Sequence, residues 1–78
     1  DAPLSEKIET EELALLIAGA VDRMPEQRRR VFSLSRYEEL SNKEIAERLN
    51  LSVKTVERHM TAALSQLRRL LTLLALFV

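Results

Sequence analysis

With 78 residues, the chain is long enough for one small domain and no second. Hydrophobic residues make up 46%, which is enough for one core and argues against a disordered chain. The absence of cysteine excludes disulfides, thiolate metal sites and cysteine nucleophiles, and one Gly with two Pro argues against an all-β fold. Because the chain starts at Asp1 rather than Met, we expect a piece of a longer protein.

The net charge of zero hides an uneven distribution of charge along the chain. Residues 1–27 carry seven acids and two bases, whereas residues 28–78 carry ten bases and five acids. Solvated helix faces can differ in charge by chance. The alternative is a basic portion that meets a polyanion and an acidic portion that faces away from it. Charge alone does not decide between the two.

Apolar residues recur every three or four positions between Thr10 and Met24, which predicts an amphipathic α-helix. The members of this stripe are Leu13, Leu16, Ile17, Ala20, Val21 and Met24. Thr10 is the expected N-cap, and Glu11 and Glu12 follow it at the positive end of the helix dipole. Pro25 ends this helix, because the residue before a proline is disfavoured in the helical conformation.

Pro25 also suits the first position of a second helix, which we expect over residues 26–37. The residues predicted to face inward on it are Val31, Phe32 and Leu34. The arginines at positions 28–30 are predicted to be partly exposed.

A short third helix is expected after Ser41, since Ser41 and Glu44 have the spacing of a capping box. Its inner residues are predicted to be Ile45, Ala46 and Leu49. Asn50 tolerates the left-handed conformation that a tight turn between helices requires, and Leu51 is expected to fill the corner.

Ser52 is the expected cap of a fourth helix, which could run to the C-terminus because neither Gly nor Pro follows. Two helices joined by a three-residue turn form a helix-turn-helix. The predicted fold is therefore an all-α, four-helix domain over residues 1–78 with a C-terminal helix-turn-helix.

The fourth helix has two distinct faces. The apolar one is expected to consist of Val53, Val56, Met60, Ala63, Leu64 and Leu67. The polar one consists of Lys54, Glu57, Arg58 and Thr61. The major groove of DNA admits one α-helix, and its bases are read by donors and acceptors near the N-terminal half of that helix. The pattern predicts a DNA recognition helix, although any one of these residues could simply belong to a solvated surface.

Each polar residue suits a particular contact with DNA. Arg58 can bind guanine through two hydrogen bonds, Glu57 can accept one from a cytosine amino group, and Thr61 can meet a base edge or a thymine methyl. The residues predicted to contact the DNA backbone are Lys43, Ser52, Lys54, Thr55 and His59. His59 has no neighbouring Cys, Asp or second His, so we predict no metal site. No cofactor is expected.

Several runs of residues resemble region 4 of bacterial RNA polymerase sigma factors, and most closely the extracytoplasmic-function (ECF) class. They are Met24-Pro25-Glu26-Gln27-Arg28, Val31-Phe32, Leu40-Ser41-Asn42-Lys43-Glu44-Ile45-Ala46, Ser52-Val53-Lys54-Thr55-Val56 and Ala63-Leu64-Ser65-Gln66-Leu67-Arg68. The resemblance covers about residues 21–71. Glycines common in the family before Leu40 and in the recognition turn are replaced by Glu39 and Asn50, which makes the backbone at Glu39 harder to predict.

The resemblance implies a four-helical domain whose last helix reads the −35 element of promoter DNA. Positions 57, 58 and 61 would then meet bases, and positions 54, 55 and 59 would lie near the backbone. Implied partners are promoter DNA, the β flap of the RNA polymerase core and an anti-sigma factor, in the cytoplasm. The family's region 2, which melts the −10 element, is absent, so this chain should bind DNA without opening it.

Three other interpretations remain open. Effector domains of LuxR-type response regulators share the run Ser41-Asn42-Lys43-Glu44-Ile45-Ala46, but they usually lack the Met24-Pro25 entry and use a separate dimerisation helix. A protein-interaction bundle is supported by the leucine-rich segment 70–78, and its apolar tail 72–78 could mediate self-association or docking. That segment is too short to insert across a membrane. An enzyme is the weakest interpretation, since no acid–base pair, phosphate loop or metal cluster is present.

Overall fold

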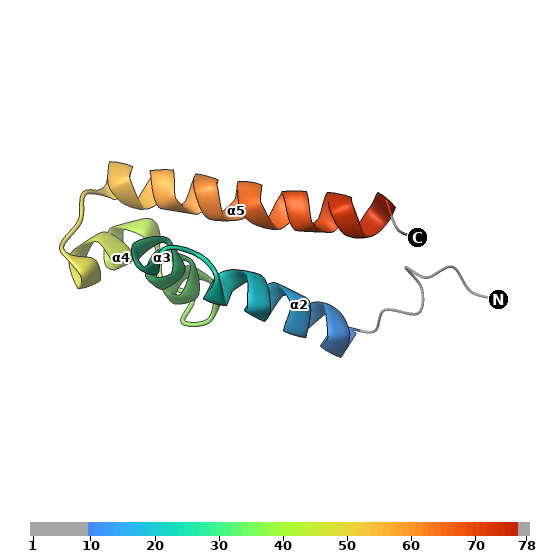
Figure 1. Cartoon of the computed structure of the whole chain (residues 1–78). Helices are drawn as coiled ribbons and strands as arrows, with labels where there is room; N and C mark the ends of the chain where they lie inside the picture. The colour runs from blue at the N-terminus through green and yellow to red at the C-terminus, as the bar shows by residue number, and fades with distance from the viewer. Residues whose placement is uncertain (1–9, 77–78) are drawn as a thin grey trace.

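The computed structural model describes residues 10–76 and forms four helices there, with no strand among those residues. They are α2 (Thr10–Asp22), α3 (Glu26–Arg36), α4 (Asn42–Leu49) and α5 (Val53–Leu76). In Figure 1, α3 and α4 lie together under the N-terminal half of α5, and α2 runs beside its C-terminal half. The prediction of an all-α domain with a C-terminal helix-turn-helix is confirmed.

The junction between α2 and α3 differs from the prediction. Helix α2 ends at Asp22, because the N–H groups of Arg23 and Met24 donate to the carbonyls of Ala20 and Val21 (3.2 and 3.0 Å) and close a tight turn. Pro25 is the N-cap of α3 rather than its first helical residue, since its ψ of 146° is extended and redirects the chain.

The start of α2 also differs from the prediction. Thr10, the predicted N-cap, is already a helical residue. The position that caps α2 therefore lies outside the described residues.

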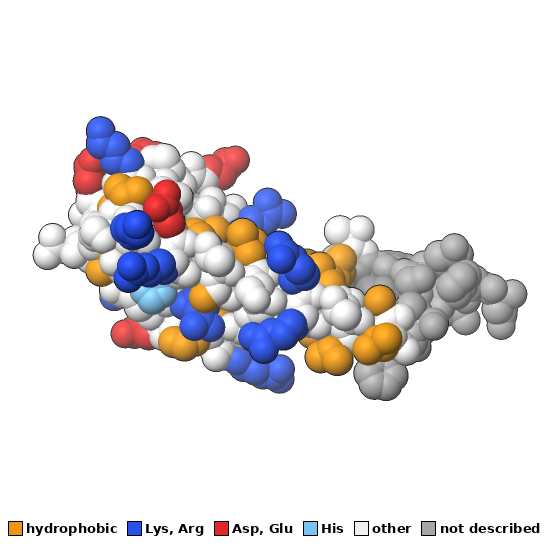
Figure 2. Space-filling view, turned by 90° about the horizontal axis from the view of Figure 1, so that it is seen from above, with side chains coloured by type: hydrophobic (Ala, Val, Ile, Leu, Met, Phe, Trp, Pro, Cys, Tyr) orange, Lys and Arg blue, Asp and Glu red, His pale blue; other side chains and the backbone are white. Residues whose placement is uncertain are grey.

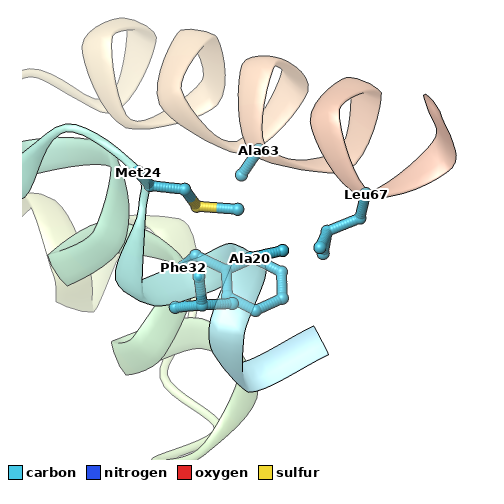
Figure 3. Packing of buried hydrophobic residues seen from close by; sticks show 6 residues of the cluster. Ala20, Met24, Phe32, Ala63 and Leu67 are labelled. Atoms are coloured by element: carbon cyan, nitrogen blue, oxygen red, sulfur yellow. The ribbon is translucent and has the colours of Figure 1, made fainter. Parts of the chain in front are cut away.

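The core consists of two buried clusters that both include α3 and α5. The first joins α2 to them through Ala20, Val21, Met24, Phe32, Ala63 and Leu67. Figure 3 shows the Met24 side chain extending toward Ala63 on α5. The second cluster joins α4 to them through Val31, Ile45, Ala46 and Val56. Met60 packs against both clusters, so α5 is held from Val56 to Leu70 by the other three helices.

Three residues predicted to face inward are instead exposed. The exposed fractions are 42% for Leu16, 42% for Val53 and 48% for Leu64. Val53 lies in the first turn of α5, ahead of the buried Val56. Leu16 and Leu64 lie on the paired helices α2 and α5, where a wide apolar stripe exceeds what one neighbouring helix can cover. The predicted inner residues Leu13, Leu34 and Leu49 are half-buried.

A polar link joins three helices beside the first cluster. The Arg28 guanidinium on α3 donates to the Gln66 side-chain oxygen on α5 (3.1 Å), and the Gln66 amide donates to the Ala20 carbonyl on α2 (3.4 Å). The Nε of Arg28 is buried without a hydrogen-bond partner. Arg28 is partly exposed, as predicted, and Gln66 supplies the oxygen that compensates its partial burial.

Replacing Gln66 with leucine is therefore expected to lower the free energy of unfolding by about 1–3 kcal/mol, because it leaves a half-buried guanidinium without its acceptor. Urea unfolding monitored by circular dichroism measures this loss. The double variant Arg28→Leu/Gln66→Leu is the control, since removing both partners should recover most of the stability. A double variant no more stable than Gln66→Leu would contradict this role.

Candidate nucleic-acid interface

The first helix of the helix-turn-helix begins with the predicted capping box. The Glu44 N–H donates to the Ser41 hydroxyl oxygen (3.1 Å), and the Ser41 N–H donates to the Glu44 carboxylate (2.8 Å). The hydrogen bonds from the Ser41 backbone and side chain hold the pKa of Glu44 below its usual range. Lys43 is exposed in this first turn, so its ammonium group is available to a phosphate.

The turn between α4 and α5 has the geometry predicted for it. Asn50 is left-handed (φ 57°, ψ 48°), and the Leu51 N–H donates to the Ala46 carbonyl (2.9 Å). Leu51 packs against the second cluster and fixes the angle between the two helices. Glu39 also has a positive φ of 56°, so the loop before α4 keeps the left-handed conformation without a glycine.

Helix α5 begins with a cap that joins two of the predicted backbone contacts. The Ser52 hydroxyl accepts a hydrogen bond from the Thr55 N–H (3.0 Å) and donates one to the Thr55 hydroxyl oxygen (2.9 Å). The Thr55 hydroxyl thus acts as an acceptor here, and its own hydrogen can be donated to a phosphate. The cap confirms the prediction that Ser52 caps this helix.

The three predicted base-reading residues, Glu57, Arg58 and Thr61, are all exposed on α5. Val56 and Ala63 on the opposite side are fully buried, so the helix cannot rotate to hide this face. Neither Glu57 nor Arg58 takes part in an ion pair within residues 10–76. Both charged groups are therefore available to an external ligand.

The predicted backbone-contacting residues lie in the first turn of α4, at the cap of α5 and in the first two turns of α5. Lys43, Ser52 and Lys54 are exposed, whereas Thr55 and His59 are half-buried. Figure 2 looks onto α5 and shows the histidine beside Lys and Arg side chains at the end where α5 begins. Within the described part of the chain, no group of three His, Asp or Glu side chains could hold a metal ion. The structure thus brings all eight predicted residues to one end of the molecule.

The structure also gathers basic residues that the sequence analysis left unassigned. Arg29, Arg30 and Arg48 surround a pocket of about 280 Å³ between α3 and α4. Arg29 forms an ion pair with Glu26, and Arg48 forms one with Glu38, each 3.9 Å long. Both pairs are solvent-exposed and therefore contribute little to the stability of the fold. The run of arginines at positions 28–30 is the sequence signal that could have indicated this basic pocket. The presence of Arg48 beside it could not be predicted in this way, because it depends on how α4 packs against α3.

An independent comparison with protein families agrees with this geometry. Residues 14–67 match the family model described as Sigma-70, region 4. The chain belongs to the sigma-70 region 4 family. The match includes α3, α4, the turn and α5 as far as Leu67, and therefore the whole helix-turn-helix of this region 4 domain. It decides between the two helix-turn-helix families suggested by the sequence, in favour of the sigma factor.

No curated protein and no solved structure matches this region 4 chain. Region 4 binds promoter DNA as part of a sigma factor in transcription initiation. Among residues 10–76, none of its helices combines the length and apolar character needed to cross a bilayer.

Proposed function

We propose that this region 4 domain recognises the −35 element of promoters as the DNA-binding end of an ECF sigma factor. The observation that carries the proposal is the exposed polar face of α5, with Glu57, Arg58 and Thr61 unobstructed while the opposite face is locked into the core. The helix can enter the major groove without any rearrangement of the domain.

Within this proposal the residues have two separate tasks. Arg58 binds a guanine through O6 and N7, Glu57 accepts a hydrogen bond from a cytosine amino group, and Thr61 meets a base edge or methyl group. Contacts to phosphates set the position of the helix along the groove and carry no sequence information of their own. The residues assigned to that task are Lys43, Ser52, Lys54, Thr55 and His59.

The proposed partners beyond DNA follow from family membership. We assign to the domain a contact with the β flap of the RNA polymerase core and control by an anti-sigma factor, in the cytoplasm. It acts by binding and carries out no catalysis of its own. Because the chain has a net charge of zero, we expect the isolated domain to bind DNA weakly, with the polymerase supplying additional affinity.

A footprint of RNA polymerase reconstituted with the full-length sigma factor tests the proposal. We expect protection of the upstream promoter hexamer, and loss of that protection when residues 10–78 are deleted. Protection that stops downstream of this hexamer, or that is unaffected by the deletion, would contradict −35 recognition. Capture of the isolated β flap by the chain tests the polymerase contact separately.

Replacing Lys54 with alanine should weaken binding to all duplexes by a similar factor. Lys54 is an exposed ammonium group in the first turn of α5, and the proposal assigns it to phosphates rather than bases. The slope of log affinity against log salt should fall by about one unit. Fluorescence anisotropy over a salt series measures it. A salt slope equal to that of the wild type would show that Lys54 does not contact a phosphate.

A further inference from the structure

Helix α2 and the C-terminal half of α5 form a two-helix arm that extends away from α3 and α4 (Figure 1). The molecule is accordingly elongated, with extents of 50 × 20 × 17 Å. Five of the eight exposed large hydrophobic residues in the described part lie on this arm, and Leu64 lies on α5 at its base; the five are Leu15, Leu16, Leu71, Leu73 and Leu76. Figure 2 shows apolar side chains gathered toward the end where α5 terminates. Two helices with so much apolar surface resemble half of a four-helix bundle.

A groove of about 450 Å³ runs along the arm where α2, α3 and α5 meet. Its lining is mostly apolar, and comes from Ile17, Phe32, Leu64, Leu67 and Leu71. Two arginines, Arg36 and Arg68, complete it, and neither forms an ion pair within residues 10–76. An occupant must therefore offer apolar side chains for the lining and carboxylates for the two guanidinium groups.

The chain itself carries a segment with this chemistry. The N-terminal half of α2 exposes Leu15 (73%) and Leu16, and each has an exposed carboxylate four residues earlier, Glu11 and Glu12. On a helix, residues four apart are neighbours on one face, so each leucine lies next to an acid. This segment cannot enter its own groove, because Ile17 of the same helix already lines that groove.

We propose that the groove receives helix α2 of a second copy of this chain. By two-fold symmetry the arrangement is reciprocal: each copy inserts Leu15 and Leu16 into the other's groove and places Glu11 and Glu12 against Arg36 and Arg68. The two arms then form a four-helix bundle, with the helix-turn-helix ends on the outside. This inference goes beyond promoter recognition and does not depend on it.

Two charge-reversed variants of the chain test the proposal by sedimentation equilibrium. In Arg36→Glu/Arg68→Glu the groove becomes acidic and faces the acidic α2 of the other copy. In Glu11→Arg/Glu12→Arg it is α2 that becomes basic, and it faces the basic groove of the other copy. Each variant alone should dissociate about tenfold more readily than the wild type, because like charges meet at both contacts. An equimolar mixture of the two should regain dimers, since both contacts of the mixed pair are again between opposite charges.

The control reverses two arginines outside the groove. Arg23, in the turn after α2, and Arg69, on α5, line a separate pocket that shares no residue with the groove, so Arg23→Glu/Arg69→Glu should associate like the wild type. Circular dichroism verifies that the exposed substitutions leave the helices intact. A wild-type chain that stays monomeric, whatever else binds the groove, would overturn the proposal. So would a mixture that fails to regain dimers, or a control that dissociates as readily as the groove variants.

Discussion

Replacing Arg58 with alanine is expected to weaken binding to the specific promoter duplex by about 1–3 kcal/mol, with much less effect on random duplexes. The guanidinium is exposed on the polar face of α5 and forms no ion pair within the described residues, so nothing else holds it. Its two parallel donors match O6 and N7 of a guanine, and no other base offers that pair of acceptors in the major groove.

Competition anisotropy with a library of single-base changes across the −35 hexamer measures this effect. Selectivity should be lost at one base position and retained at the others. Arg30→Ala is the matched control, because Arg30 is also exposed and without an ion pair among residues 10–76 but lies on α3. An equal loss on specific and random duplexes for Arg58→Ala would assign Arg58 to the DNA backbone instead.

Replacing Ile45 with alanine is expected to reduce the free energy of unfolding by about 2–5 kcal/mol. Ile45 is completely inaccessible and contributes to the cluster that holds α4 against α3 and α5. Native domains have only about 5–15 kcal/mol in total, and short ones lie toward the lower end, so this variant should lose a large share of its stability and unfold at a markedly lower temperature than the wild type. Thermal and urea unfolding monitored by circular dichroism measure the loss.

A matched pair on α5 separates burial from the chemistry of the substitution. Val56 has no exposed surface, whereas Val53, three residues earlier on the same helix, is 42% exposed. The same change to alanine should destabilise the protein clearly at Val56 and only slightly at Val53. Equal effects at the two positions would mean that the second cluster does not govern stability. DNA binding by these variants should follow the folded fraction, because neither side chain is assigned to DNA.

The positions of α4, the turn and α5 could be predicted from the sequence because their signals are local. Ser41 and Glu44 cap each other within one helical turn, and the Ser52 hydroxyl caps the Thr55 N–H at the start of α5. Asn50 takes the left-handed conformation by its own backbone preference. The exposure of Glu57, Arg58 and Thr61 also followed from helical spacing alone, whereas their contacts with bases stay predictions.

The tertiary structure decided which apolar positions remain uncovered and which distant residues meet. Helical spacing placed Leu16 and Leu64 on apolar stripes. Burial, however, depends on how many helices lie alongside, and around Leu16 and Leu64 the helices α2 and α5 have too few neighbours to cover both side chains. Arg28 and Gln66 are 38 residues apart and meet because α3 packs against α5. The groove likewise draws its lining from three helices. Such features depend on the packing of whole helices, which no short run of residues encodes.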